Sequence, residues 1–319
     1  MKMRLTTIHF LSVMIAFAAL AENLFAQTSE ASAAIAPARP RRPENVPANS
    51  NLPSLFIIGD STVRNGSGRG DGGQWGWGDE IAPFFDTNKI NVVNRALGGT
   101  SSRTFYRDQW PRVEAMLKPG DFVIMQFGHN DASPINEAVL NSRARARGTI
   151  KGVGDETQSV TNVITKKFEV VRSFGWYERQ MIAGARVKDA TPMICSLIPR
   201  NNWKNGSVAR NKNDYAGWAG QAARSENAPF LDINEIIARQ YDELGQEKVK
   251  PLFIVGAGPH TSMAGAETNA ACVVAALKGL KEDPLAKFFS EKANGVAAAD
   301  LSQSAPKPIV PAPDKTEPE

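Results

Sequence analysis

The sequence predicts an α/β fold, a three-layer α/β/α sandwich around a central five-stranded parallel sheet. Five short runs rich in apolar and β-branched residues recur between residues 55 and 232, and their apolar residues are consecutive instead of alternating with polar residues. Helical patterns separate one run from the next. Strands of this kind lie in parallel sheets that helices cover on both faces, and the loops after their carboxyl ends build the functional site.

The elements follow one another in a regular order. The apolar runs predict strands at 55–59, 91–94, 121–127, 191–198 and 229–232. Between and after them, apolar spacing predicts helices at 78–85, 109–117, 168–185, 214–225, 233–244 and 262–281. The Arg- and Gly-rich stretch 134–159 is predicted to be a long functional loop.

Both ends of the chain are predicted to lie outside this domain. Residues 1–26 begin with basic residues, continue in an apolar run that is too short to span a membrane, and end in small residues, as a secretory signal peptide does. The Ala- and Pro-rich stretch 27–52 predicts a disordered linker, and the Pro-, Lys- and Glu-rich stretch 286–319 predicts a flexible tail. The domain then covers 53–285, and we expect a secreted or periplasmic protein without a membrane span after signal removal.

Composition argues against several classes of function. The net charge is only +4, and no basic stripe is interleaved with aromatic residues, so we expect no nucleic-acid partner. Two histidines remain after the leader, and the cysteines have no paired spacing, so we expect no metal. The Gly-x-Gly-x-x-Gly match at 68–73 begins well past the end of the first strand, so we expect no nucleotide or other cofactor.

The two cysteines, Cys195 and Cys272, each lie inside an apolar run. A disulfide between them is allowed after export, but the sequence favours buried free thiols.

Small and polar residues follow the first three predicted strands. Gly-Asp-Ser-Thr at 59–62 would present the Ser61 hydroxyl on a tight turn, although a serine there can also simply cap a helix. The Gly-Gly pair that ends in Gly99 would bring a backbone N–H close to a ligand, or only make a turn. Asn130 could aim its amide at a negatively charged oxygen, or hold its own turn.

Taken in order, these residues resemble the conserved blocks of the SGNH (GDSL) hydrolases. The resemblance rests on Gly-Asp-Ser at 59–61, Gly99, Gly-His-Asn-Asp at 128–131 and His260. The wording Gly-Gly-Thr-Ser-Ser-Arg-Thr-Phe at 98–105, with Thr-Ser and Ala-Gly-Ala-Glu after the histidine, is most similar to the rhamnogalacturonan acetylesterase branch. The resemblance extends from residue 55 to about residue 280 and implies the flavodoxin-like fold of these hydrolases.

The resemblance also implies roles for individual residues. Ser61 would be the nucleophile and His260 the general base, and the N–H groups of Ser61 and Gly99 with the Asn130 amide would form the oxyanion hole. The chemistry agrees, because a serine needs a base to take its proton and an oxyanion needs several preorganised donors. Asp60 and His129 are assigned supporting roles, with His129 the one rival base in the mature chain.

One position departs from the family. In the family an aspartate precedes the histidine by three positions, and here that residue is Ala257. The acid of a triad fixes the imidazole tautomer and stabilises the imidazolium, so its loss predicts weakened activity. Three readings stay open: a backbone carbonyl orients His260, a carboxylate such as Asp232 reaches in from another strand end, or catalysis has decayed and a sugar-binding surface survives.

We therefore expect a secreted carbohydrate esterase that removes O-acetyl groups from rhamnogalacturonan-type pectic polysaccharide or oligosaccharide. Arg103 and Arg200 could pair with uronate carboxylates, and Trp203 could line the substrate cleft. Two alternatives stay open. One is a catalytically impaired glycan-binding homologue of the same fold, and the other is a lipid or thioester hydrolase.

Overall fold

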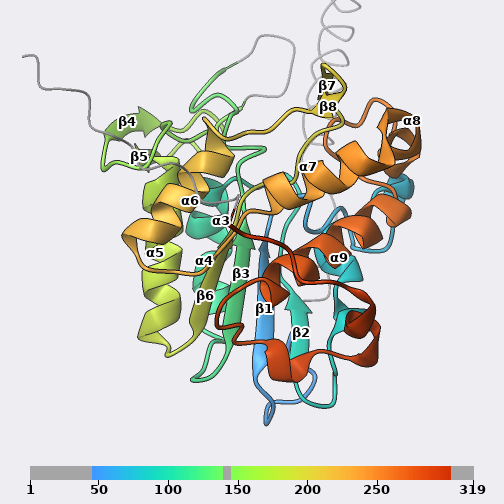
Figure 1. Ribbon diagram of the computed structural model, residues 1–319. Coiled ribbons are helices and arrows are strands. Elements are labelled where there is room, and N and C mark those ends of the chain that lie inside the picture. Colours follow the sequence, from blue (N-terminus) through green and yellow to red (C-terminus); the bar gives the residue numbers. More distant parts are fainter. Residues whose placement is uncertain (1–44, 139–144, 303–319) are drawn as a thin grey trace, which may run out of the picture. The chain divides into compact units, whose positions relative to one another are not determined.

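A computed structural model describes residues 45–138 and 145–302 of the protein. Its central sheet contains β1 (Ser54–Gly59), β2 (Asn91–Asn94), β3 (Phe122–Gln126), β6 (Thr191–Cys195) and β9 (Phe230–Leu231). All pairings between these strands are parallel, and the order across the sheet is β2-β1-β3-β6-β9 (Figure 1). The five predicted strands and their parallel arrangement are confirmed.

Helices cover both faces of the sheet, which confirms the three-layer prediction. In β1, Leu55 and Ile57 join the hydrophobic core on one face, and Phe56 and Ile58 join the core on the other. The first core is covered by α2 (Trp77–Glu80), α7 (Ile233–Leu244) and α9 (Met263–Lys278). The second is covered by α3 (Ser102–Asp108), α4 (Trp110–Glu114), α5 (Phe174–Val187) and α6 (Tyr215–Ser225) (Figure 1).

Several helix predictions differ from the structure at their ends. The predicted helix 78–85 is divided into α2 and the 3-10 turn η2 (Ala82–Phe84), in which Pro83 occupies one of the first two positions. The predicted helix 109–117 shortens to α4, which α3 precedes directly. Helix α3 was not predicted, although Ser101 and Thr104 cap it reciprocally.

The largest correction concerns residues 157–172, which form an antiparallel hairpin. Strand β4 (Thr157–Thr161) pairs with β5 (Phe168–Arg172), so the first five residues of the predicted helix 168–185 are a strand, and the helix starts only at Phe174. The Phe168 side chain is 71% exposed, so its apolar character does not mark a helix face packed on the core. The predicted loop 134–159 ends inside this hairpin.

The remaining elements are short. Strands β7 (Trp203–Lys204) and β8 (Ser207–Val208) form a second hairpin, and α8 (Gln246–Val249) leads into η3 (Lys250–Leu252). The glycine-rich stretch contains η1 (Asp71–Gly73). No helix within 45–138 or 145–302 is long and apolar enough to cross a membrane.

The described parts of the two flanking segments dock on the domain. Asn49, from the expected linker, donates its N–H to the Asn91 side chain at 3.0 Å. In the expected flexible tail, η4 (Ala286–Phe288) and η5 (Glu291–Gly295) pack on the domain with Phe288 buried, so that expectation is wrong for residues 286–299. The predicted signal peptide, residues 27–44 and residues 303–319 lie outside the described residues.

Candidate active site

Ser61 lies on a tight turn at the carboxyl end of β1. The Asp60 carbonyl accepts from the N–H groups of Val63 and Arg64, and the Asp60 carboxylate accepts from the Thr62 N–H at 2.8 Å and from its hydroxyl at 2.7 Å. Gly59 is required here, because a Cβ would lie 2.5 Å from Val63 and 2.6 Å from the Gln126 carbonyl oxygen. The turn leaves Ser61 half-buried at the edge of the sheet.

His260 comes from a loop held mostly by main-chain hydrogen bonds. The loop 254–260 is closed by the Ile254 N–H, which donates to the His260 carbonyl at 3.0 Å. Thr261 forms antiparallel bridges with both Trp75 and Phe253, and its hydroxyl donates to the Trp75 carbonyl at 2.9 Å. Ser262 then caps α9. The main chain is therefore held in place both before and after His260.

The structure brings Ser61 and His260 together. Ser61 Oγ lies 2.8 Å from Nε2 of His260, although 199 positions separate the two residues in the sequence. This is the hydrogen-bond distance that a nucleophile and its general base require.

The other ring nitrogen of His260 forms a hydrogen bond with the main chain. The ring donates to the backbone carbonyl of Ala257, at the position where the resemblance led us to expect an aspartate. The Asp232 carboxylate instead accepts from the Ser196 hydroxyl at 2.8 Å and caps α7. Of the three readings of this site, the backbone carbonyl is the one that these contacts support.

The pKa of His260 is lowered. Burial is the main cause and the positive charge of Arg200 adds to it, while the hydrogen bond to the Ala257 carbonyl acts in the opposite direction. His260 is therefore neutral at pH 7 and can accept a proton.

The candidate oxyanion-hole residues lie beside Ser61. A Cβ on Gly98 would lie 3.4 Å from that of Ser61, and Gly99 has a φ of +86°, which an L side chain rarely adopts. The Gly99 carbonyl accepts from Nη1 of Arg147 at 3.0 Å, and Asn130 donates one amide proton to the Thr100 carbonyl at 2.8 Å. The second amide proton of Asn130 remains for a ligand.

Asp131 connects the loops after β2 and β3. Its buried carboxylate accepts from the N–H and hydroxyl of Ser102 and from the Gly128 N–H. Burial raises its pKa to about 7 despite these hydrogen bonds. The Gly-His-Asn-Asp motif contains Asp131, but the motif alone did not predict this role.

The surroundings of His129 do not suit a general base. Both of its ring nitrogens are buried without a hydrogen-bond partner among the described residues. Burial, with the charges of Arg200 and His260, lowers its pKa to about 3, so the ring is neutral. Asp60 is also buried, and burial raises its pKa to about 6 against the hydrogen bonds from Thr62.

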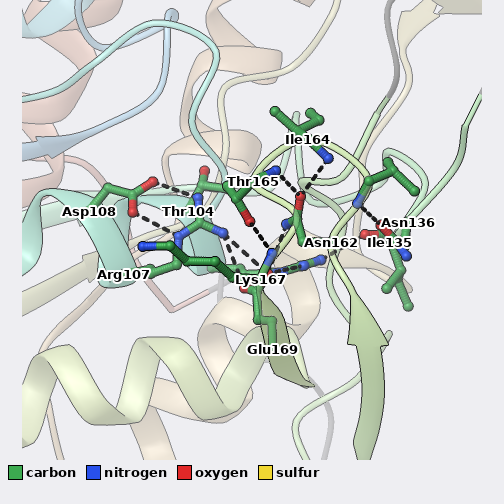
Figure 2. A network of polar contacts seen from close by, with 12 residues as sticks. Thr104, Arg107, Asp108, Ile135, Asn136, Asn162, Ile164, Thr165, Lys167 and Glu169 are labelled. Carbon is green, nitrogen blue, oxygen red and sulfur yellow. Dashed lines mark hydrogen bonds and ion pairs between the residues drawn. The ribbon is translucent and has the colours of Figure 1, made fainter.

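The three predicted substrate-binding residues have different surroundings. Arg103 is fully buried and donates to both oxygens of Glu169, at 2.8 and 2.7 Å, and to two backbone carbonyls, so it cannot bind substrate. Figure 2 shows the polar network around Glu169, which also includes Arg107 and Asn162. Arg200 is exposed near His260. Trp203 is half-buried in β7 and donates to Asn201.

One basic residue at the site was missed. Arg147 lies in the predicted loop 134–159, in the run Arg-Ala-Arg-Ala-Arg-Gly at 143–148, whose alternating arginines were the available signal. Within the described part of the chain, no three His, Cys, Asp or Glu side chains come together in a way that could hold a metal ion.

Comparison with known proteins agrees with this geometry. The profile of the family "GDSL-like Lipase/Acylhydrolase" matches residues 55–273. A probable rhamnogalacturonan acetylesterase of Bacillus subtilis, YesY, is 31% identical over 236 residues, which are 72% of this chain and 92% of that protein. The rhamnogalacturonan acetylesterase of Emericella nidulans is 29% identical over 202 residues, which are 63% of this chain and 75% of that protein.

The fold is also similar to that of a solved structure. The crystal structure of the Bacillus subtilis protein YxiM superimposes with a TM-score of 0.55 at 23% identity. The match covers 72% of this chain and 56% of that one.

Proposed function

This chain belongs to the GDSL-like lipase/acylhydrolase family and is a serine ester hydrolase, and from that premise we propose that it removes O-acetyl groups from rhamnogalacturonan-type pectic polysaccharide. The observation that carries the proposal is the 2.8 Å contact between Ser61 Oγ and His260 Nε2. The acetylesterase names of two relatives support the choice of the acyl group and of the polysaccharide.

The proposed reaction has two halves. Ser61 Oγ attacks the acetyl carbonyl while His260 Nε2 takes its proton, and the resulting oxyanion is held by the N–H groups of Ser61 and Gly99 and by the Asn130 amide. His260 then gives the proton to the departing sugar oxygen, which leaves an acetyl group on Ser61. Water, deprotonated by the same imidazole, then attacks the acetyl carbonyl, and the imidazolium returns that proton to Ser61 Oγ as acetate leaves.

The arrangement differs from a full triad. The Ala257 carbonyl accepts from the imidazole, which fixes the neutral tautomer with Nε2 free to take a proton. A carbonyl carries no full charge, so it stabilises the imidazolium less than a carboxylate does. We propose an active but weakened esterase, and the intact Ser61–His260 contact favours it over a glycan-binding homologue that has lost catalysis.

We also propose that the protein acts outside the cytoplasm, either secreted or in the periplasm. The basic start and short apolar run of residues 1–26 support this, as does the location of pectic polysaccharide outside cells.

Replacing Ser61 by alanine tests the proposed function. We expect Ser61→Ala to lower the hydrolysis of p-nitrophenyl acetate at least a thousandfold, because loss of the nucleophile costs on the order of 10⁶ in a serine protease. Ser67→Ala, which removes a nearby hydroxyl bound to Asp71 instead, should retain activity.

The same experiment separates the alternatives. Equal rates from wild type and Ser61→Ala would leave a glycan-binding protein. Release of acetate from acetylated xylan but not from acetylated rhamnogalacturonan would reject the proposed substrate, and a preference for long-chain p-nitrophenyl esters would indicate a lipid hydrolase.

A further inference from the structure

We propose that Arg147 and Arg200 bind carboxylate groups of the substrate on either side of Ser61, so that the site selects acetyl esters carried by uronic acid chains. The proposal rests on the proposed function and adds the residues that would recognise the negative charge of the substrate. Arg103 was predicted to bind substrate, but it is fully buried, and we assign this role to Arg147 instead.

Arg200 lies on the His260 side of the site. It follows the apolar run of β6, and a Cβ added to Gly258 would lie 3.5 Å from its Nη1. Gly258 is two positions before His260 in the loop that carries the base. Arg200 is exposed, and the ion pairs among residues 45–138 and 145–302 do not include it.

Arg147 lies on the opposite side, next to Gly99. Its Nη1 donates to the Gly99 carbonyl at 3.0 Å, and its Nε donates to the Ser133 hydroxyl at 3.1 Å. Both partners are neutral, and the half-buried guanidinium has no carboxylate within ion-pair distance in the described part of the chain. Its further N–H donors remain for a ligand, since a guanidinium has five.

Three other arginines of the fold are each paired with a carboxylate. Arg103 is paired with Glu169, Arg179 with Asp155 and Arg210 with Asp242, at 2.7, 2.6 and 2.6 Å. Among the described residues, Arg147 and Arg200 both act electrostatically on the buried Asp60 carboxylate, of which Oδ1 accepts from Thr62 and Oδ2 has no hydrogen-bond partner. Two cations that lack an ion-pair partner among the described residues attract anions to the site, and a guanidinium matches a carboxylate with two parallel hydrogen bonds.

A carboxylate on Arg200 would also act on the base. The groups that face His260 are the Ser61 hydroxyl, the Ala257 carbonyl, the neutral ring of His129 and the cation of Arg200. The cation makes the imidazolium less stable, and no carboxylate at position 257 compensates. A bound anion would offset the charge of Arg200 and supply part of what the missing aspartate provides elsewhere in the family.

The test compares two forms of one acetylated rhamnogalacturonan oligosaccharide, with free carboxyl groups and with the same groups methyl-esterified, measured by acetate release. We expect wild type to show a kcat/KM roughly tenfold or more higher for the acid form, the effect of one charge-assisted hydrogen bond. Arg200→Gln should remove most of this preference, and Arg147→Gln should reduce it. The matched control is Arg224→Gln, an exposed arginine in the last turn of α6.

The pH profile distinguishes this role from a merely structural one. With the acid form, the apparent pKa of the base in kcat should be higher than with the methyl ester, because the bound carboxylate favours the imidazolium. In Arg200→Gln the two profiles should coincide. Equal kcat/KM for both forms in wild type, or an unchanged preference in Arg200→Gln, would overturn the proposal.

A binding measurement tests the anion site independently of whether the protein hydrolyses esters. In Ser61→Ala, calorimetry with the two oligosaccharide forms should give tighter binding of the acid form, and Arg200→Gln in that background should abolish the difference. Equal affinities reject the anion site even if the enzyme hydrolyses esters. Loss of all ester hydrolysis in wild type would reject the proposed function and still leave this binding comparison decisive.

Discussion

The imidazole of His260 is held on both sides by groups without a full negative charge. Nε2 meets the Ser61 hydroxyl at 2.8 Å, and the ring donates to the Ala257 carbonyl. The geometry of a catalytic dyad is thus present, while the electrostatic support of the imidazolium is reduced. In the proposed mechanism, alanine at position 257 lowers the stability of the imidazolium and keeps the position of the ring.

Restoring the carboxylate should strengthen the base. We expect Ala257→Asp to increase kcat for p-nitrophenyl acetate and to raise the pKa of His260, because a nearby negative charge favours the imidazolium. Hydrolysis requires the neutral ring and is lost as pH falls through this pKa, so the acidic limb of the profile should move to higher pH. Ala257→Asn is the uncharged control, and a large loss of activity in Ala257→Asp would contradict the prediction.

At this scale, the sequence predicted the side chains and the N–H groups of the site, and it left open which group orients His260. Ser61 and His260 follow from motif order, and the structure brings them together. The replacement for the missing acid is a carbonyl, which every residue has, so its position depends on the path of the loop 254–260. Arg103 was misread because Glu169, which buries its charge, lies 66 positions away.

Among the elements, the hairpin of β4 and β5 is an addition to the sandwich, and the ion pair of Glu169 with the buried Arg103 helps to hold it there. Arg103 from α3 reaches Glu169 on β5, and it also donates to the carbonyls of Ile135 and Gly148. The hairpin and the loop that carries Arg147 therefore share one anchor. Sequence periodicity could not reveal this, because two of the three apolar residues of β5, Phe168 and Val170, are exposed and the apolar residues together resemble a helix stripe.

Removing the anchor should destabilise the protein. Arg103→Met leaves the Glu169 carboxylate, which is 14% exposed, without its main partner, and breaking such a pair costs about 3–5 kcal/mol of unfolding free energy. Urea denaturation at pH 7 measures this loss. Arg107→Met is the control, because Arg107 contacts the same carboxylate at 3.2 Å but is 34% exposed, and it should cost at most about 1 kcal/mol.

The pH dependence of this difference follows from Glu169. Burial opposes ionisation, but the hydrogen bonds from Arg103 and Asn162 prevail and lower its pKa from 4.5 to about 2. A lowered pKa contributes stability that is present above the unfolded value and is lost as pH falls through the folded one. The gap between wild type and Arg103→Met should therefore shrink between pH 4 and pH 2. A gap that is constant with pH would indicate that the lost packing of the arginine dominates.

Across the whole molecule, the apolar runs sufficed to predict the five strands and the three layers. The order β2-β1-β3-β6-β9 places the ends of β1, β2, β3 and β6 at one edge, where Ser61, Gly99, Asn130 and Arg200 follow them. The tail was less predictable, because a few apolar side chains suffice to hold it. Phe288 stacks edge-on against Phe122, with ring centroids 5.8 Å apart, within a segment whose composition is otherwise typical of a flexible chain.

The thiols should remain free even after export. Cys195 and Cys272 are buried free cysteines in the same core, and burial raises the pKa of both, of Cys272 to about 12. We expect mass spectrometry of the purified protein to show no iodoacetamide labelling in the native state and two labels after unfolding without reductant. A mass two units lower that resists labelling would indicate a disulfide.

The contact between Ser61 and His260 also has a consequence for the folding of the chain. Because 199 positions separate them, the hydroxyl finds its imidazole only after almost the entire polypeptide has been synthesised and the loop before α9 has docked against Trp75. A nascent fragment ending before residue 260 would carry the serine without its partner. The recovery of esterase activity after dilution from denaturant therefore reports when these two distant residues come into contact. The circular-dichroism signal reports helix formation, which should be earlier.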